Sequence, residues 1–242
     1  MRVLVVSDIH SNLSALDAVL ADAPAYDQIW SLGDIVGYGP QPCECIARLS
    51  EYEHQRIPGN HDWGAIGKIS LDVFNKQAAK AALWTREQLS ASDMAYLGEL
   101  DEVLELEGVT LAHGSPRAPI WEYVVRADIA MENMAAFSTR LCLVGHSHVP
   151  VAYWQQHAGR NCIGLQLPEG EPFSYAEGRS LINPGSVGQP RDADPRASYL
   201  VLDTSAETVE HRRVAYDIGA TQTLMRSRKL FGRNIDRLEY GI

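Results

Sequence analysis

The chain has 242 residues, of which 45% are hydrophobic and 21% charged, and its formal net charge is −10. This length allows a substantial buried core, and the composition is that of an ordinary soluble protein. The negative net charge argues against a protein that binds nucleic acid through clustered Lys and Arg. No apolar run of about 18 residues is present to span a membrane. Because the start also lacks a signal-peptide pattern, we expect a cytoplasmic protein with neither a membrane nor a nucleic-acid partner.

The first predicted element is a buried strand in residues 2–10, where a short apolar run ends in Asp8 and His10. These side chains are two positions apart, so they share one side of the strand's carboxyl end, where open α/β sheets bind ligands. Ser11 and Asn12 can cap a following helix, in which residues 13, 16, 19 and 20 keep apolar helical spacing.

Two further strands of the same kind follow. Residues 28–32 form the second and end at Gly33-Asp34, and a long loop then leads to a helix with Pro42 in its first turn. Residues 54–58 form the third strand, which ends in the sequence Gly59-Asn60-His61-Asp62. These strand–helix units should have right-handed crossovers.

The middle of the chain is predicted to begin with helices and to continue with a β-hairpin and a further helix. Residues 70–90 have a broad apolar stripe at helical spacing, and a short helix starts at Ser92. Residues 103–111 predict a β-hairpin with a Glu-Gly turn, which leads to His113. A helix over residues 128–137 is expected to place its methionines, Met131 and Met134, in the core.

An apolar strand over residues 141–144 ends at Gly145-His146-Ser147-His148. The remainder is mainly β, with strands expected at residues 151–154, 180–182, 198–202 and 208–214, and a last helix capped by Asp217. Parallel units followed by antiparallel strands, with no repeat or linker, favour a single domain over residues 1–242 with a two-sheet core and outer helices.

Polar side chains at the predicted strand ends form an oxygen and nitrogen set: Asp8, His10, Asp34, Asn60, His61, His113, His146 and His148. Carboxylate and imidazole ligands suit Mn, Fe, Zn, Co or Ni rather than calcium. Seven ligands are too many for one tetrahedral ion but match two ions about 3.5–4 Å apart, with Asp34 as the candidate bridge. His54, His157 and His211 lie outside this pattern, and we expect ordinary surface or hydrogen-bonded side chains there.

At these residues the sequence resembles the calcineurin-like metallophosphoesterase superfamily. The signature motifs stand complete and in order as Asp8-Ile9-His10, Gly33-Asp34, Gly59-Asn60-His61-Asp62, His113 and Gly145-His146-Ser147-His148. The segment Ile182-Asn183-Pro184-Gly185-Ser186-Val187 looks like the closing motif of the small bacterial and archaeal phosphodiesterase-type members. The resemblance implies an α/β (α+β) fold, a four-layer αββα sandwich of two mixed sheets flanked by helices, with a dinuclear metal site at strand ends.

The same resemblance implies the site roles. One divalent ion would be held by Asp8, His10, Asp34 and His148, and the other by Asp34, Asn60, His113 and His146. His61 would face the substrate as general acid or charge stabiliser, and Asp62 would orient it by a hydrogen bond. Manganese is the first candidate for both ions, with Fe, Zn, Ni, Co and Mg as alternatives.

Substrate contacts are expected from Asn12, Tyr38, Arg117 and Arg191. The two arginines can clamp a phosphate in bidentate fashion, or can equally be surface ion pairs. Tyr38 can stack on a base or an aryl leaving group, and Trp121 and Tyr123 are similar candidates, with core packing as the alternative for each.

The sequence thus predicts a phosphoesterase, either phosphodiesterase or phosphatase, that attacks phosphorus with a hydroxide bridging two divalent metals. The substrate would be a small phosphate ester or a nucleotide, and a dinucleoside polyphosphate stays open. A protein-binding scaffold of the same fold is the alternative from another class, although His61 and every ligand are present. A homo-oligomer is compatible with the sequence.

Overall fold

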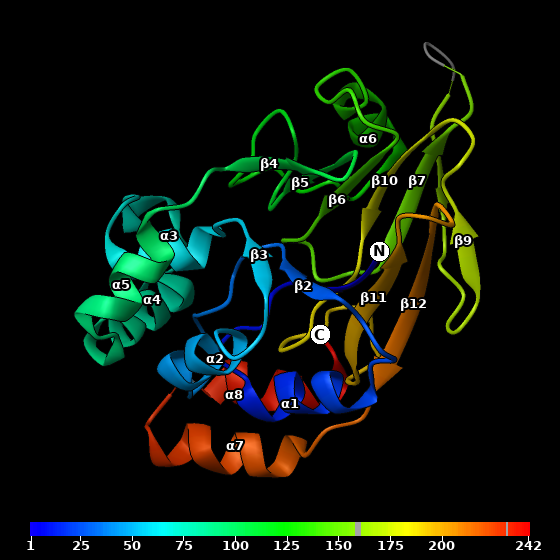
Figure 1. The fold of residues 1–242 in the computed structure, drawn as a ribbon. Helices are drawn as coiled ribbons and strands as arrows, with labels where there is room; N and C mark the ends of the chain where they lie inside the picture. Colours follow the sequence, from blue (N-terminus) through cyan, green and yellow to red (C-terminus); the bar gives the residue numbers. More distant parts are fainter. Residues whose placement is uncertain (158–160, 231) are drawn as a thin grey trace.

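Two six-stranded sheets, stacked face to face, form the centre of the molecule (Figure 1). The computed structural model describes residues 1–157, 161–230 and 232–242. The first sheet has the strand order β3-β2-β1-β11-β12-β9 and the second has the order β4-β5-β6-β10-β7-β8. Both are mixed, because β1 lies parallel to β2 and antiparallel to β11, while β10 lies parallel to β6 and antiparallel to β7.

The strands of the first sheet are β1 (Arg2–Val6), β2 (Gln28–Ser31), β3 (His54–Arg56), β9 (Pro172–Ser174), β11 (Ala197–Asp203) and β12 (Thr208–Val214). Those of the second are β4 (Val103–Leu106), β5 (Val109–Ala112), β6 (Leu141–Val144), β7 (Val151–Gln155), β8 (Ile163–Leu165) and β10 (Arg179–Asn183). The helices are α1 (Leu13–Asp22), α2 (Pro42–Leu49), α3 (Asn60–Ile66), α4 (Lys76–Gln88), α5 (Ala91–Gly98), α6 (Ala127–Asn133), α7 (Ile218–Ser227) and α8 (Gly232–Tyr240), with a 3-10 turn at Leu71–Val73.

Period-two alternation along the strands separates three apolar layers. Val3 and Val5 of β1 face the second sheet and pack in one cluster with Leu143 of β6. Leu4 and Val6, on the other face of β1, pack against α1 and α2. The outer face of the second sheet packs against α6, and Figure 1 shows α6 and α1 on opposite sides of the two sheets. The predicted helix–sheet–sheet–helix architecture is therefore confirmed.

Most predicted elements are present, and three differ. The helix expected over residues 70–90 is interrupted, because the side chain of Asn75 accepts from the backbone N–H groups of Gln77 and Ala78 and starts α4 there. The loop expected up to Pro172 contains β8 and β9. Asp217 caps α7 as predicted, but α8 follows it, with Ile235 and Leu238 buried.

The prediction for the two methionines is half wrong. Met134 is 3% exposed and packs in the cluster under α6, whereas Met131 is 41% exposed. The helix ends at Asn133, so the chain beyond it turns Met134 and Phe137 inward, while Met131 stays on the solvent face of α6. In the described ranges, none of the helices has the length and apolar character needed to cross a membrane. That residues 1–242 form one domain stays a prediction.

Candidate metal centre

Five strand ends deliver the predicted ligands to one place. They lie after β1, β2, β3, β5 and β6, and they carry Asp8 and His10, Asp34, Asn60, His113, and His146 and His148 respectively. All seven side chains are between 0% and 4% exposed. Buried carboxylates and imidazoles must be paired or hold a metal, because an isolated buried charge is very unfavourable.

The backbone at this place is strained. Five of the seven predicted ligands have positive φ, namely Asp8 (53°), His10 (48°), Asp34 (52°), His146 (65°) and His148 (61°). A left-handed conformation costs about 1–3 kcal/mol at such residues and persists where the surroundings determine it, which is often at functional sites. Here the N–H groups of Asp8 and His10 donate to the carbonyls of Gly33 and Asp34, at 3.0 and 2.9 Å.

Two glycines allow the loops after β2 and β3 to touch. Gly33 has φ +90°, and a Cβ there would lie 2.6 Å from the nitrogen of Gly59. A Cβ on Gly59 would lie 2.0 Å from Oδ1 of Asp34. The glycines that precede Asp34 and Asn60 are therefore required for the close approach of these two ligands.

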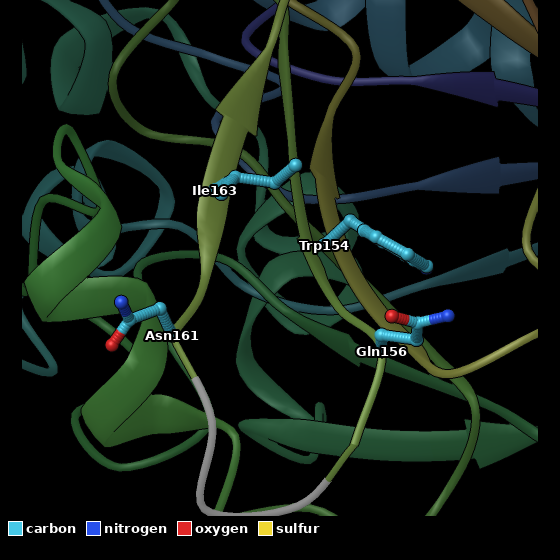
Figure 2. A pocket seen from close by; sticks show the side chains of 4 residues that line it. All are labelled: Trp154, Gln156, Asn161 and Ile163. Atoms are coloured by element: carbon cyan, nitrogen blue, oxygen red, sulfur yellow. The ribbon is translucent and has the colours of Figure 1, made fainter.

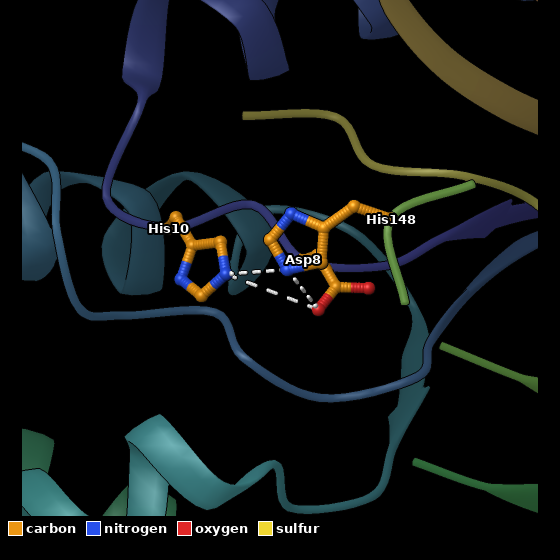
Figure 3. A group of neighbouring side chains, drawn as sticks. All are labelled: Asp8, His10 and His148. Atoms are coloured by element: carbon orange, nitrogen blue, oxygen red, sulfur yellow. Dashed lines mark hydrogen bonds and ion pairs between the residues drawn. The ribbon is translucent and has the colours of Figure 1, made fainter. Parts of the chain in front are cut away.

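Asp8, His10 and His148 form the first group of candidate ligands, shown in Figure 3. Nε2 of His148 lies 3.1 Å from Oδ1 of Asp8 and 3.1 Å from Nε2 of His10. The other carboxylate oxygen of Asp8 accepts from the hydroxyl of Ser7 and from the N–H of His146. Oδ1 of Asp8 is buried without a hydrogen-bond partner and faces the group.

The imidazoles are oriented by backbone carbonyls. Nδ1 of His10 lies 3.2 Å from the carbonyl oxygen of Val36, and Nδ1 of His148 lies 2.6 Å from that of Gln189. A carbonyl only accepts, so each Nδ1 carries the proton and each Nε2 presents a lone pair. Two Nε2 lone pairs then face one another at 3.1 Å, an arrangement that a cation between them stabilises.

Asp34, His113 and His146 form the second group. Nδ1 of His113 donates to the carbonyl oxygen of Leu32 at 2.8 Å, which turns its Nε2 towards the group. This Nε2 lies 3.2 Å from Nδ1 of His146. Oδ1 of Asn60 is 3.3 Å from the same Nε2, which brings the amide into this group.

Asp34 lies between the two groups. Its Oδ2 is 3.7 Å from Nε2 of His10 and 3.4 Å from Nε2 of His113. Burial opposes ionisation of Asp34, but His113 and His61 hold the pKa of the carboxyl well below its ordinary value. A buried anion between nitrogen donors on both sides has the position that a bridging ligand needs.

The donor set fits two divalent ions of the kind that nitrogen and oxygen ligands prefer. Burial disfavours the charged form of His113, yet the carboxylate of Asp34 raises the pKa of this imidazole to about 9. Burial lowers the pKa of His146 to about 3, and its Nε2 has no partner. At neutral pH the site therefore combines ionised carboxylates with an unprotonated His146, while His113 holds a proton that a bound metal ion would displace.

His61 lies against this centre, but Asp62 does not support it as expected. The ring of His61 lies 5.0 Å from that of His10, and its Nδ1 is buried without a partner. Both oxygens of Asp62 accept from backbone N–H groups, those of Val36 and Gly59, so this carboxylate caps α3. A hydrogen bond from His61 is not formed, because the N–H of Gly59 at the start of α3 and the N–H of Val36 in the loop after β2 engage both carboxylate oxygens.

Two of the four predicted substrate contacts are engaged elsewhere. Asn12 caps α1 through its Oδ1, and its Nδ2 donates to the carbonyl of Gly188 at 3.0 Å. Arg117 makes ion pairs with Glu122 and Glu132. Asn12 thus holds two loops together, and Arg117 is the surface ion pair that the sequence left open.

The other two predicted contacts lie close to the centre. The ring of Tyr38 is 4.8 Å from that of His10 and 4.3 Å from that of His61. The charge of Arg191 lowers the pKa of His148, after the larger effect of burial. The Nε of Arg191 is itself buried without a partner.

Three aromatic side chains lie near the centre: Tyr123 contacts His146 of the second group, Phe74 meets the ring of His61 at 5.5 Å, and Trp121 packs on Phe74. Tyr123 stacks on His146 with ring centroids 3.8 Å apart, and Trp121 meets Phe74 at 5.1 Å. Trp121 and Tyr123 are 39% and 47% exposed, so they are not core residues. They offer flat faces beside the ligands on which a base or aryl group can stack.

A hollow of about 330 Å³ lies at the β7–β8 edge of the second sheet. Figure 2 shows the side chains that line it, Trp154, Gln156, Asn161 and Ile163. None of them is a predicted site residue. The three other histidines are ordinary as expected, because His157 is exposed while His54 and His211 hydrogen-bond to Tyr96 and Ser198.

Comparison with known proteins gives a consistent result. A family model described as the calcineurin-like phosphoesterase superfamily domain matches residues 1–207. The uncharacterized protein MJ0912 of Methanocaldococcus jannaschii is 40% identical over 223 residues, which cover 89% of this chain and 88% of that protein. The crystal structure of a metallophosphoesterase from Sphaerobacter thermophilus is 47% identical, has a TM-score of 0.92, and is matched over 100% of this chain and 99% of its own.

A third relative matches a smaller part. The symmetrical bis(5′-nucleosyl)-tetraphosphatase of Ectopseudomonas mendocina is 33% identical over 98 residues, or 38% of this chain and 35% of that protein. The buried ligand loops, the two stacked sheets and the match over residues 1–207 agree with one another. This chain belongs to the calcineurin-like phosphoesterase superfamily.

Proposed function

We propose that this protein is a hydrolase that cleaves small phosphate esters with the help of two divalent metal ions. The observation that carries the proposal is the pair of facing imidazole nitrogens in each ligand group, 3.1 Å apart between His10 and His148 and 3.2 Å between His113 and His146. Membership of a phosphoesterase family supports the reaction class. Phosphodiesters and phosphomonoesters are both candidate substrates.

In this proposal one ion is held by Asp8, His10, Asp34 and His148, and the other by Asp34, Asn60, His113 and His146. The position of Oδ2 of Asp34 within 4 Å of donors in both groups supports its role as the bridge. Two ions held in this way supply Lewis acidity and lower the pKa of water, which makes a nucleophile available at neutral pH. Manganese is our first candidate for both.

The chain's own residues would complete the site. His61 lies beside the first group and would stabilise or protonate the leaving oxygen. Its backbone N–H donates to Oδ1 of Asp34 at 2.8 Å, which ties the position of His61 to the bridging ligand. Asp62 would act through the backbone of the loop rather than on the imidazole. Arg191 would contact the phosphate, and Tyr38 would pack against His61.

The test is hydrolysis of bis-p-nitrophenyl phosphate and p-nitrophenyl phosphate by metal-stripped protein, with Mn, Ni, Co, Zn or Mg restored singly. Turnover that depends on the metal is expected, and the ratio of the two rates distinguishes diester from monoester hydrolysis. Two ions bound per chain without turnover of either ester would contradict the proposal and favour the scaffold alternative.

A dinucleoside polyphosphate is a second candidate substrate. It is favoured by the partial match to a symmetrical bis(5′-nucleosyl)-tetraphosphatase and by the exposed faces of Trp121 and Tyr123, on which a base could stack. Release of two nucleoside diphosphates from diadenosine tetraphosphate, followed by chromatography, would support it. Failure to cleave this compound at rates that exceed those of the nitrophenyl esters would exclude it.

A further inference from the structure

A second hollow, of about 430 Å³, lies between the loop that carries Tyr38, the start of α4, and α8. Of the seven side chains that line it, Lys76, Arg233 and Arg237 are cationic, and the others are Tyr38 and three uncharged amides. None is acidic, in a chain whose formal net charge is −10. We call this hollow the cationic pocket.

The cationic pocket is joined to the metal centre by two direct contacts. Tyr38, which lines the pocket, packs on His10 and His61. Gln189 makes the second contact, because its carbonyl accepts from Nδ1 of His148 at 2.6 Å while its side chain points to the arginines. Its Oε1 accepts from Arg191 at 3.0 Å and from Arg237 at 3.2 Å.

The cations of the pocket have no matching anions. Other arginines, such as Arg48 and Arg196, pair with carboxylates. Across the part of the chain that the structure describes, neither the three cations that line the pocket nor the neighbouring Arg191 makes an ion pair with an Asp or Glu side chain, although Nε of Arg237 donates to the backbone oxygen of Ile242. One neutral amide oxygen, that of Gln189, instead holds two guanidinium groups side by side.

Two guanidinium groups that share one neutral acceptor repel each other. Burial strengthens this repulsion, because less water screens the two charges. Burial and the charge of Arg191 together lower the pKa of Arg237 to about 10. An anion that enters the pocket relieves this repulsion, and the fork of an arginine matches the oxygens of a phosphate in bidentate fashion.

We propose that the cationic pocket binds a second phosphate group of the substrate, so that the natural substrate is a phosphate ester that carries at least one further phosphate. This inference rests on the function proposed above. Arg233 and Arg237 belong to α8, red in Figure 1, which lies beyond the residues 1–207 matched by the family model. Two of the three cations that line the pocket thus lie outside the region that the family model matches, whereas Lys76 lies inside it.

The test compares two chromogenic esters that differ by one phosphate, thymidine 5′-(p-nitrophenyl phosphate) and its 3′-phosphorylated counterpart. We expect kcat/KM to be about tenfold higher for the phosphorylated ester, the effect of one charge-assisted bidentate contact. Arg237→Gln should reduce this ratio towards one. Arg140→Gln, just before β6 and with 59% of its side chain exposed, should keep both the rates and the ratio of the wild type.

Binding to the metal-stripped protein separates the inference from the proposed function. By calorimetry, thymidine 3′,5′-bisphosphate should bind about tenfold more tightly than thymidine 5′-monophosphate, and Arg237→Gln should remove the difference. If the bisphosphate binds more tightly than the monophosphate but neither ester is hydrolysed, the result would support the cationic pocket and refute the proposed function. If both esters are hydrolysed with equal kcat/KM and the two nucleotides bind with equal affinity, the result would refute the role of the cationic pocket and leave the proposed function unaffected.

Discussion

At the scale of single residues, three of the four histidines proposed as ligands are oriented by their second nitrogen. Nδ1 of His10, His113 and His148 each faces a backbone carbonyl, at 3.2, 2.8 and 2.6 Å. His61 lacks such a partner, since its Nδ1 is buried and unpaired. Nε2 of His146 is unpaired as well, but the ring of His146 is stacked on that of Tyr123.

His61→Ala should lower kcat by about 10²–10⁴-fold and leave the metal content unchanged, because it removes an acid but none of the ligands. Asp34→Asn should reduce the metal content of both sites. Metal analysis beside steady-state kinetics checks both variants, and His157→Ala, at an exposed position, is the control. Loss of metal from the His61 variant would refute the role given to this residue.

His211 gives a pH dependence that is separate from the metal centre. It is 3% exposed, and burial, followed by the charge of Arg213, lowers its pKa to about 4 from the ordinary 6.5. The unfolded chain then takes up a proton that the folded chain resists as the pH falls from 6.5 towards 4. Stability contributed by neutral His211 is therefore full above pH 6.5 and falls by up to about 3 kcal/mol by pH 4.

Urea unfolding at pH 7.0, 5.5 and 4.5 measures this slope in the wild type and in His211→Gln. The variant should lose less stability between pH 7.0 and 4.5 than the wild type, whatever its stability at pH 7.0. Identical slopes in the two proteins would show that His211 is not responsible.

At the scale of elements, α6 tests how helical spacing relates to burial. Met134, at the end of α6, packs in the core cluster, whereas Met131 lies 41% exposed on the same turn. Met134→Ala should lower the free energy of unfolding by about 2–5 kcal/mol, because it leaves a cavity. Met131→Ala should change it by less than about 0.5 kcal/mol. Equal losses in chemical denaturation would contradict this assignment of faces.

The strands and helices also explain which parts of the candidate site could be predicted from the sequence. Most candidate ligands could be found in the sequence because they follow an apolar strand, so that local pattern and chemistry agree at Asp8, Asp34 and His146. The role of Asp62 could not, because the backbone of α3 competes for its carboxylate. Gln189 was missed altogether, since its backbone carbonyl orients His148 and a carbonyl leaves no signal in the sequence. Arg237 was missed because α8 itself was not recognised.

At the scale of the whole molecule, the two ligand groups tie distant segments together. Asp8 and His148 are 140 positions apart, and Asp34 and His113 are 79 apart, and each pair meets inside one ligand group. Ions that bind only the folded chain should therefore stabilise it. Free Mn at about 100 times its dissociation constant is worth roughly 2.7 kcal/mol per site, or an increase of about 5–10 °C in Tm.

Thermal unfolding of chelator-treated protein before and after addition of Mn measures this stabilisation. Asp34→Asn should show a smaller increase than the wild type, because its change affects a ligand shared by both groups. A Tm that does not respond to any of Mn, Co, Ni or Zn would exclude a stabilising metal site.

The pairing of β1 with segments late in the chain also determines when the candidate metal centre can form during protein synthesis. The residues of β1 pair with β11, and the loop after β1 accepts hydrogen bonds from Val187 and Gly188 at 3.0 Å each. A ribosome that adds about 5–20 residues per second needs roughly 10–40 s to travel from the first of these partners to the last. The nascent chain thus exposes Asp8 and His10 long before the residues around them are made. Metal binding at the proposed site would therefore follow the synthesis of β11.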